Sequence, residues 1–152
     1  MLTVATWAYR AVALLAVSLA AGCGGSSSSS SSASATPATF TQVYADIFPL
    51  GTQAQCNYCH DRPANEISNG MLDMGHTQAD VYAAIVGTSS MSAKCGAPHT
   101  LVVPGDSSTS LLFLKLQATP PCGDRMPQGG SPLSAASLEM VHSWIDAGAM
   151  NN

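Results

Sequence analysis

The stretch Cys56-Asn57-Tyr58-Cys59-His60, CNYCH, places two thiols and an imidazole within one short segment. The spacing Cys-x-x-Cys occurs in zinc sites, in redox dithiols and, when His follows, at sites where haem is attached covalently. The fold is built around whichever of these three chemistries applies. The rest of the chain has to distinguish them.

The first 22 residues have the features of a secretory signal peptide. One positive charge, Arg10, precedes an apolar run over residues 11–21 that only Ser18 interrupts. This run is too short for an ordinary membrane-spanning helix. We therefore expect the chain to be exported and residues 1–22 to be removed.

The end of this signal, Leu19-Ala20-Ala21-Gly22-Cys23, resembles the lipobox of bacterial lipoproteins. The resemblance implies cleavage before Cys23, a lipid on Cys23 and a location in the bacterial cell envelope, facing the periplasm. The family more often has Leu in place of Ala20, and the alternative is a soluble exported protein cleaved at another small-residue site. Gly24, rather than Asp, follows the lipid cysteine, which is compatible with the outer membrane.

Residues 23–38 are predicted to be a disordered linker, because they are rich in Gly and Ser and contain no apolar residue larger than Ala. Residues 39–150 are then expected to form one small domain. Five Lys/Arg stand against nine Asp/Glu in the chain, and without Arg10 the ratio is four to nine. With no basic run, nucleic acid is not an expected partner.

Two helices are predicted in the first half of the domain. The first has apolar residues at i, i+3, i+4 and i+7 from Phe40 and is stopped by Pro49. The second begins at a capping box formed by Thr77 and Asp80 and ends at Gly87.

Two further helices are predicted in the second half. The segment 110–116, SLLFLKL, follows a Pro-Gly turn with Asp106 or Ser107 as its cap, although its continuous apolar run also fits a buried strand. The last helix opens at Ser134 and closes at Gly148, with Leu138, Val141 and Ile145 on one face. No stretch sustains a period of two, so the predicted fold class is all-α.

Each of the five cysteines has an expected chemical role. Cys23 takes the lipid, Cys56 and Cys59 belong to the CNYCH motif, and Cys95 and Cys122 remain. In an oxidising compartment, the remaining two are expected to form a disulfide, which would stabilise the fold by roughly 3 to 4 kcal/mol.

Zinc and dithiol chemistry are the competing interpretations. A four-thiolate zinc site would use both cysteine pairs, but the second pair lacks the close Cys-x-x-Cys spacing, and zinc does not explain His60. A thioredoxin-like dithiol is disfavoured because no βαβ pattern surrounds the motif. Haem explains each residue: Cys56 and Cys59 bond to the vinyl groups and His60 binds the iron from one side.

A second axial ligand would occupy the remaining coordination position of the iron, and several residues could supply it. Met140 and His142 are explained by packing in the last helix, and Met150 is expected in a frayed tail. Met126 lies in a polar loop, GDRMPQGG, where it is poorly explained as core filler. Spacing alone leaves the choice open among Met71, Met74, Met91, Met126, Met140, Met150, His76, His99 and His142.

Several segments agree in order with one known family: CNYCH, 69–74, 103–106, 110–112, 125–127 and 133–134 leading to 144–149. Over about residues 42–149 the chain resembles a planctomycete-type cytochrome c domain. The resemblance implies a small class I cytochrome c-like helical fold around one covalently bound haem c, with the first and last helices crossing near Trp144. It also implies that Met126 is the distal iron ligand. Cys95 and Cys122 depart from the family pattern, and we expect their bridge to hold the loop of Met126 in place.

The expected function is that of a membrane-tethered monohaem c-type cytochrome, not an enzyme, which carries single electrons to and from redox proteins of the periplasm. Arg125 is a candidate for contact with a haem propionate or a nearby carboxylate, and the haem edge is expected to be ringed by neutral or acidic residues. The alternative is a haem-bearing accessory or sensor module of a larger envelope complex, which does not shuttle electrons. A haem enzyme ranks last, because no second catalytic constellation is visible.

Overall fold

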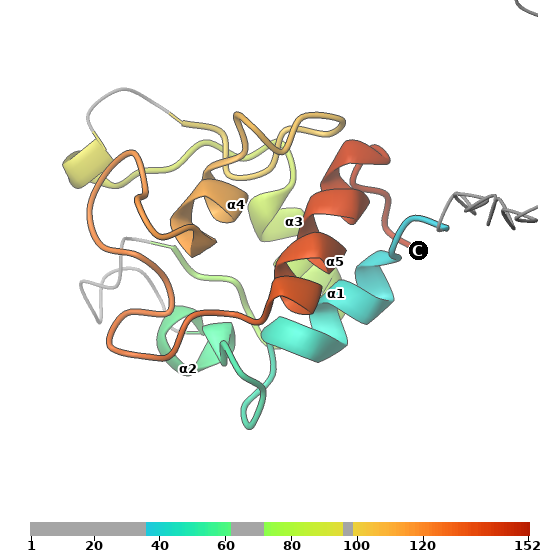
Figure 1. The fold of residues 1–152 in the computed structure, drawn as a ribbon, viewed down its shortest axis with the longest axis horizontal. Coiled ribbons are helices and arrows are strands. Elements are labelled where there is room, and N and C mark those ends of the chain that lie inside the picture. The colour runs from blue at the N-terminus through green and yellow to red at the C-terminus, as the bar shows by residue number, and fades with distance from the viewer. Residues whose placement is uncertain (1–35, 62–71, 96–98) are drawn as a thin grey trace, which may run out of the picture. The chain divides into compact units, whose positions relative to one another are not determined.

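The computed structural model describes residues 36–61, 72–95 and 99–152, which form a set of short helices joined by long loops (Figure 1). The helices are α1 (Phe40–Ile47), α2 (Cys56–His60), α3 (Gln78–Ile85), the 3-10 helix η1 (Ala93–Cys95), α4 (Leu111–Leu116) and α5 (Ala135–Asp146). The described residues contain isolated β-bridges but no strand, which agrees with the all-α prediction. The predicted signal peptide, Cys23, the linker up to residue 35, and Met71 lie outside the described residues. None of the described helices has the length and apolar character needed to cross a membrane.

Capping boxes start both α1 and α3. The hydroxyl of Thr39 accepts from the backbone N–H of Gln42, whose side chain accepts from the N–H of Thr39. Thr77 and Asp80 form the same reciprocal pair at the start of α3, as the sequence predicted. Each box satisfies two N–H groups that have no partner within their helix.

Helices α1 and α5 lie against each other and enclose the aromatic part of the core (Figure 1). Phe40 and Trp144 are fully buried, with ring centroids 4.9 Å apart, and Tyr82 of α3 meets Phe40 edge-on at 5.1 Å. The hydroxyl of Tyr82 donates to the carbonyl of Ala149 at 2.9 Å. The first and last helices are thus joined by direct packing and through α3.

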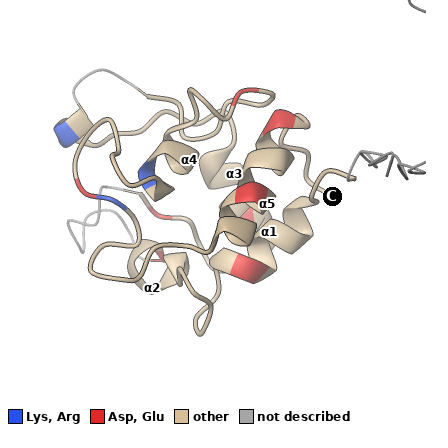
Figure 2. Ribbon diagram, in the orientation of Figure 1, with Lys and Arg blue, Asp and Glu red and all other residues tan. Residues whose placement is uncertain are grey.

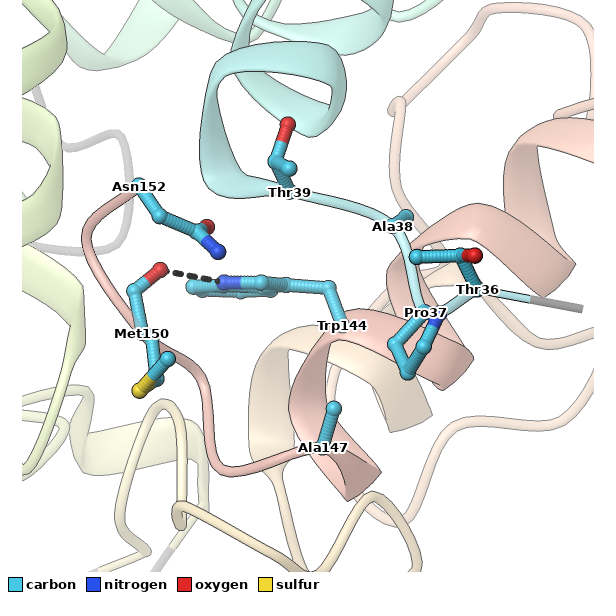
Figure 3. A pocket seen from close by; sticks show the side chains of 8 residues that line it. All are labelled: Thr36, Pro37, Ala38, Thr39, Trp144, Ala147, Met150 and Asn152. Carbon is cyan, nitrogen blue, oxygen red and sulfur yellow. Dashed lines mark hydrogen bonds between the residues drawn. The ribbon is translucent and has the colours of Figure 1, made fainter.

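The C-terminal residues are fixed against α1, so the expected fraying of this tail is wrong. Trp144 Nε1 donates to the carbonyl of Met150 at 2.9 Å, beside a small pocket between residues 36–39 and the C-terminal segment (Figure 3). The side chain of Asn152 accepts from the N–H of Phe40, and its carbonyl accepts from the N–H of Thr41, both at 2.9 Å. Two N–H groups at the start of α1 are satisfied in this way.

Segment 111–116 is a helix, α4, and the alternative of a buried strand is wrong. Its N-cap is Ser110, so the prediction of Asp106 or Ser107 as cap is also wrong. Asp106 instead closes the preceding turn, where its carboxylate accepts from the N–H of Thr109 at 3.2 Å. The buried hydroxyl of Ser110 accepts from the N–H of Val103 at 2.8 Å and donates to the carbonyl of Asp106 at 2.7 Å. Ser110 therefore fixes the turn from which α4 begins.

Candidate functional site

The CNYCH motif forms the short helix α2, which the sequence pattern did not predict. Gln55 precedes it in the left-handed region, with φ 47° and ψ 46°, and turns the chain into the helix. The N–H of Asn57 donates to the carbonyl of Phe48 at 3.0 Å, which ties α2 to the end of α1. Cys56 and Cys59 are three residues apart on this helix, so both side chains lie on the same side of it.

The ring of His60 is oriented by the segment that precedes α3. His60 Nδ1 lies 3.3 Å from the carbonyl oxygen of Leu72. A carbonyl can only accept, so the hydrogen bond puts the proton on Nδ1 and the lone pair on Nε2, as a histidine ligand requires. The next residue, Asp61, forms an ion pair with His76, which also ties the end of α2 to the start of α3.

Helix α2 lies at a cleft of about 910 Å³ whose walls are largely aliphatic. This volume is within the range of about 300–1,000 Å³ that is typical of ligand and cofactor sites. Apolar wall residues come from three segments: Leu72, Met74, Leu101, Leu111, Leu112 and Leu116. The same cleft is lined by Cys56, Cys59, His60 and Met126. This set of donors in an apolar cleft fits a covalently attached haem with a histidine and a methionine ligand.

Met126 lies on the long loop between α4 and α5, and its backbone is anchored at the end of α4. Its N–H donates to the carbonyl of Lys115 at 2.7 Å. The guanidinium of the neighbouring Arg125 donates to the carbonyl of Gly130 at 3.2 Å, which joins two residues of the same loop. Arg125 is not among the residues that line the cleft, and the expected contact with a propionate has no support from its position.

The structure separates Met126 from most of the other proposed ligands. Met140, Met150, His76, His99 and His142 are not among the cleft-lining residues. Met74 lines the cleft, but its N–H donates to the carbonyl of His60, so its backbone is on the same stretch of wall as that histidine. Met91 also lines the cleft, with 70% of its surface exposed.

The state of the cysteines bears on the alternatives to haem. Burial raises the pKa of the Cys56 thiol to about 12, which is unlike the low-pKa thiolate of a reactive dithiol. Cys95 and Cys122 are joined in a disulfide, the pairing predicted from the cysteine count, and so cannot complete a four-thiolate zinc site. In the parts of the chain that the structure describes, no group of three or more His, Cys, Asp or Glu could hold a metal ion.

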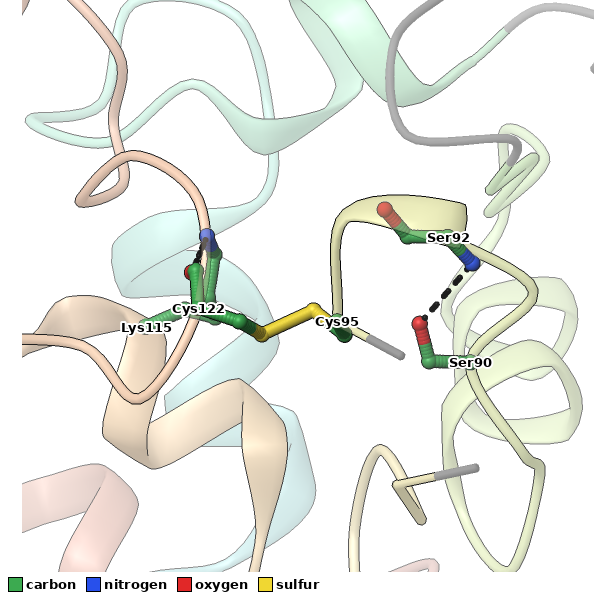
Figure 4. The surroundings of a disulfide bond; sticks show 5 residues. All are labelled: Ser90, Ser92, Cys95, Lys115 and Cys122. Atoms are coloured by element: carbon green, nitrogen blue, oxygen red, sulfur yellow. Dashed lines mark hydrogen bonds between the residues drawn. A yellow bond between two sulfur atoms is a disulfide. The ribbon is translucent and has the colours of Figure 1, made fainter. Parts of the chain in front are cut away.

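The disulfide joins η1 to the loop of Met126, and Lys115 of α4 reaches the same place (Figure 4). Lys115 Nζ donates to the carbonyl of Cys122 at 2.8 Å. Burial lowers the pKa of Lys115, an effect that Asp124 opposes and Lys94 reinforces.

Sequence reasoning missed the two lysines of the cleft, since nothing in their spacing relates them. Lys94 and Lys115 both line the cleft, whereas a neutral or acidic rim was expected. Figure 2 shows the described Lys and Arg residues, in blue, at the end of α4 and on the segments at the left of the view, away from the contact of α1 with α5.

Comparison of the chain with protein-family models, with curated proteins and with solved structures finds no significant match.

Proposed function

We propose that this protein is a c-type cytochrome, with one covalently bound haem, that carries single electrons in the bacterial cell envelope. One observation carries the proposal: the CNYCH helix and the distant Met126 line one cleft with aliphatic walls. Haem, when bound there, supplies a one-electron couple at its iron. Each of these residues then has a role that zinc or dithiol chemistry would leave unexplained.

The chain's own residues would attach and orient the cofactor. Cys56 and Cys59, on one side of α2, would form the two thioether bonds. The hydrogen bond from His60 Nδ1 to Leu72 would hold the imidazole in the tautomer whose lone pair is on Nε2, the form that binds iron. The sulfur of Met126 would be the second axial ligand, which favours electron transfer over catalysis at an open iron.

The surroundings of the cleft suit an electron carrier that meets partners at one edge. The aliphatic walls keep water from most of the cofactor, which together with methionine ligation raises the reduction potential. Tyr58 and Cys59, within the attachment motif, are exposed, so the thioether edge is open to solvent. Redox proteins of the periplasm would exchange electrons there, while a lipid on Cys23 keeps the domain at a membrane.

The test is a pair of spectra from the exported protein, produced with haem-attachment machinery. A pyridine haemochrome assay reports whether two thioether bonds have formed, and the oxidised and reduced visible spectra report the spin state. Met126→Ala should convert a low-spin haem to a high-spin one. Met91→Ala is the matched control, because Met91 lines the same cleft from an exposed loop and should leave the spectrum unchanged.

Each other result has a distinct meaning. Haem that is attached but high-spin in the unaltered protein favours the alternative of a sensor or accessory module. Loss of the low-spin spectrum in Met91→Ala, and not in Met126→Ala, would move the ligand to Met91. Absence of attached haem would refute the proposal.

A further inference from the structure

Two lysines form a cationic end of the cleft. Lys94 belongs to η1, and Lys115 to the last turn of α4, and both line the cleft. The third described cation, Arg125, does not line it. The cleft therefore combines aliphatic walls with two positive charges that come from different segments.

The side chains of these lysines converge on one point of the backbone. A Cβ atom placed on Gly123 would lie 3.2 Å from Lys115 Nζ and 3.9 Å from Lys94 Cδ. The disulfide enforces this approach, because Cys95 follows Lys94 and Cys122 precedes Gly123. The chain thus holds two like charges together, which by itself is unfavourable.

The charges are not compensated by an ion pair among the described residues. Lys115 Nζ donates to the carbonyl of Cys122 at 2.8 Å, and an ammonium group can donate three hydrogen bonds. Asp124 and Asp73 also line the cleft, and Asp124 attracts Lys115, but neither forms a salt bridge with Lys94 or Lys115. Two lysines at one end of the cleft, without a salt bridge among the described residues, are suited to bind carboxylates.

We propose that Lys94 and Lys115 bind the carboxylates that haem carries on the edge opposite its vinyl groups, an inference that rests on the function proposed above. Thioether bonds to Cys56 and Cys59 would fix the vinyl edge at α2. Figure 1 shows α2 in green and η1 in yellow well apart, and residues of both line the same cleft. A flat cofactor attached at α2 extends across the cleft, and its propionates reach the end where the lysines converge.

This arrangement gives the disulfide a role at the cofactor. By joining η1 to the loop after α4, it brings the side chains of both lysines to the end of the cleft that the propionates would reach. The lysines then orient the haem in the cleft and offset the negative charge of its carboxylates near the iron. Offsetting that charge favours the reduced, less positive form of the iron.

The reduction potential of the holoprotein is the first test. Lys94→Gln and Lys115→Gln, singly and together, are compared with Lys94→Arg/Lys115→Arg, an arginine control that keeps both positive charges. Each glutamine variant is expected to shift the one-electron equilibrium toward the oxidised form by about tenfold, or about 59 mV. The arginine control should shift it by less than about twofold. Equal shifts in the glutamine variants and the arginine control, or no shift in any of them, would overturn the inference.

A second measurement tests whether the lysines bind the carboxylates of haem. A Cys56→Ala/Cys59→Ala protein is titrated with haemin and with haemin dimethyl ester, which lacks free carboxylates. Neutralising both lysines should weaken haemin binding by about tenfold or more and leave ester binding unchanged. Equal weakening for both ligands would overturn the inference even if the potentials shift.

Failure of the inference can be distinguished from failure of the proposed function. If the unaltered protein carries thioether-bound haem and the glutamine variants behave like the arginine control, only the lysine site is wrong. If no haem is attached to the unaltered protein, both proposals are wrong.

Discussion

Removing the disulfide tests how the loop of Met126 is held. Cys95 and Cys122 are 27 residues apart in sequence, and the bridge closes that loop in the unfolded chain as well. On the chain-entropy relation, a loop of this length corresponds to a stabilisation of about 3.5 kcal/mol at 25 °C. We expect the Cys95→Ala/Cys122→Ala protein to lose about this much of its free energy of unfolding. Both cysteines are replaced, because one unpaired thiol could react with the cysteines of the haem motif.

Urea unfolding of the holoprotein, followed by circular dichroism, measures this loss. With a slope of about 1–3 kcal/mol/M, the midpoint should fall by about 1 to 3.5 M. A loss below about 1 kcal/mol with an unchanged slope would refute the argument from loop closure.

The Cys95→Ala/Cys122→Ala protein also tests whether the disulfide keeps Met126 in position as the proposed iron ligand. Met126 follows Cys122 by four residues, and the bridge and the hydrogen bond to Lys115 both anchor this loop. Without the bridge, a larger fraction of high-spin haem is expected at temperatures well below unfolding. A low-spin spectrum identical to that of the unaltered protein would show that the hydrogen bond to Lys115 is sufficient.

Three further substitutions test the fold. Ser110→Ala leaves a buried backbone N–H and a carbonyl without their partner and should cost about 1–3 kcal/mol in urea unfolding, whereas the exposed Ser108→Ala should cost less than about 0.5 kcal/mol. Tyr82→Phe removes the hydrogen bond that reaches the C-terminal segment and should cost about 1 kcal/mol; no change would mean that water replaces this bond. The pKa of Asp146 is lowered because its carboxylate accepts from the N–H of Ser107, so the charge stabilises the fold above the carboxyl's unfolded pKa and this contribution is lost as the pH falls through its folded pKa. Between pH 7 and pH 3, Asp146→Asn should therefore lose less stability than the unaltered protein, by a few tenths of a kcal/mol for so exposed a group; an equal loss would show that the charge does not contribute.

The helices that the sequence predicted are those whose signals are local. The apolar spacing from Phe40, the capping box at Thr77 and the serine at 134 each define a helix start within a few residues. The predicted cap of α4 was wrong because Asp106 closes the preceding turn, and the helix begins only after Ser110. Helix α2 was missed because five residues are too few for a helical period to show.

The CNYCH part of the candidate site was predictable from the spacing of its own residues. The approach of Met126 to the same cleft depends on how the loop after α4 folds back, which no local pattern shows. A family resemblance, and not spacing, pointed to Met126. The pair Lys94 and Lys115 gave no sequence signal, because a net negative charge says nothing about where the few cations gather.

The two sides of the domain are held together by different interactions. Helices α1 and α5 bury Phe40 and Trp144 against each other, and Tyr82 of α3 packs on the same core. The side with the cleft has a five-residue helix, a three-residue helix and a long loop, joined by a disulfide and isolated hydrogen bonds. Short elements of this kind bury too little apolar surface to offset the entropy of ordering a loop. A large apolar group bonded to α2, and held at its far edge by two lysines, would supply the missing core.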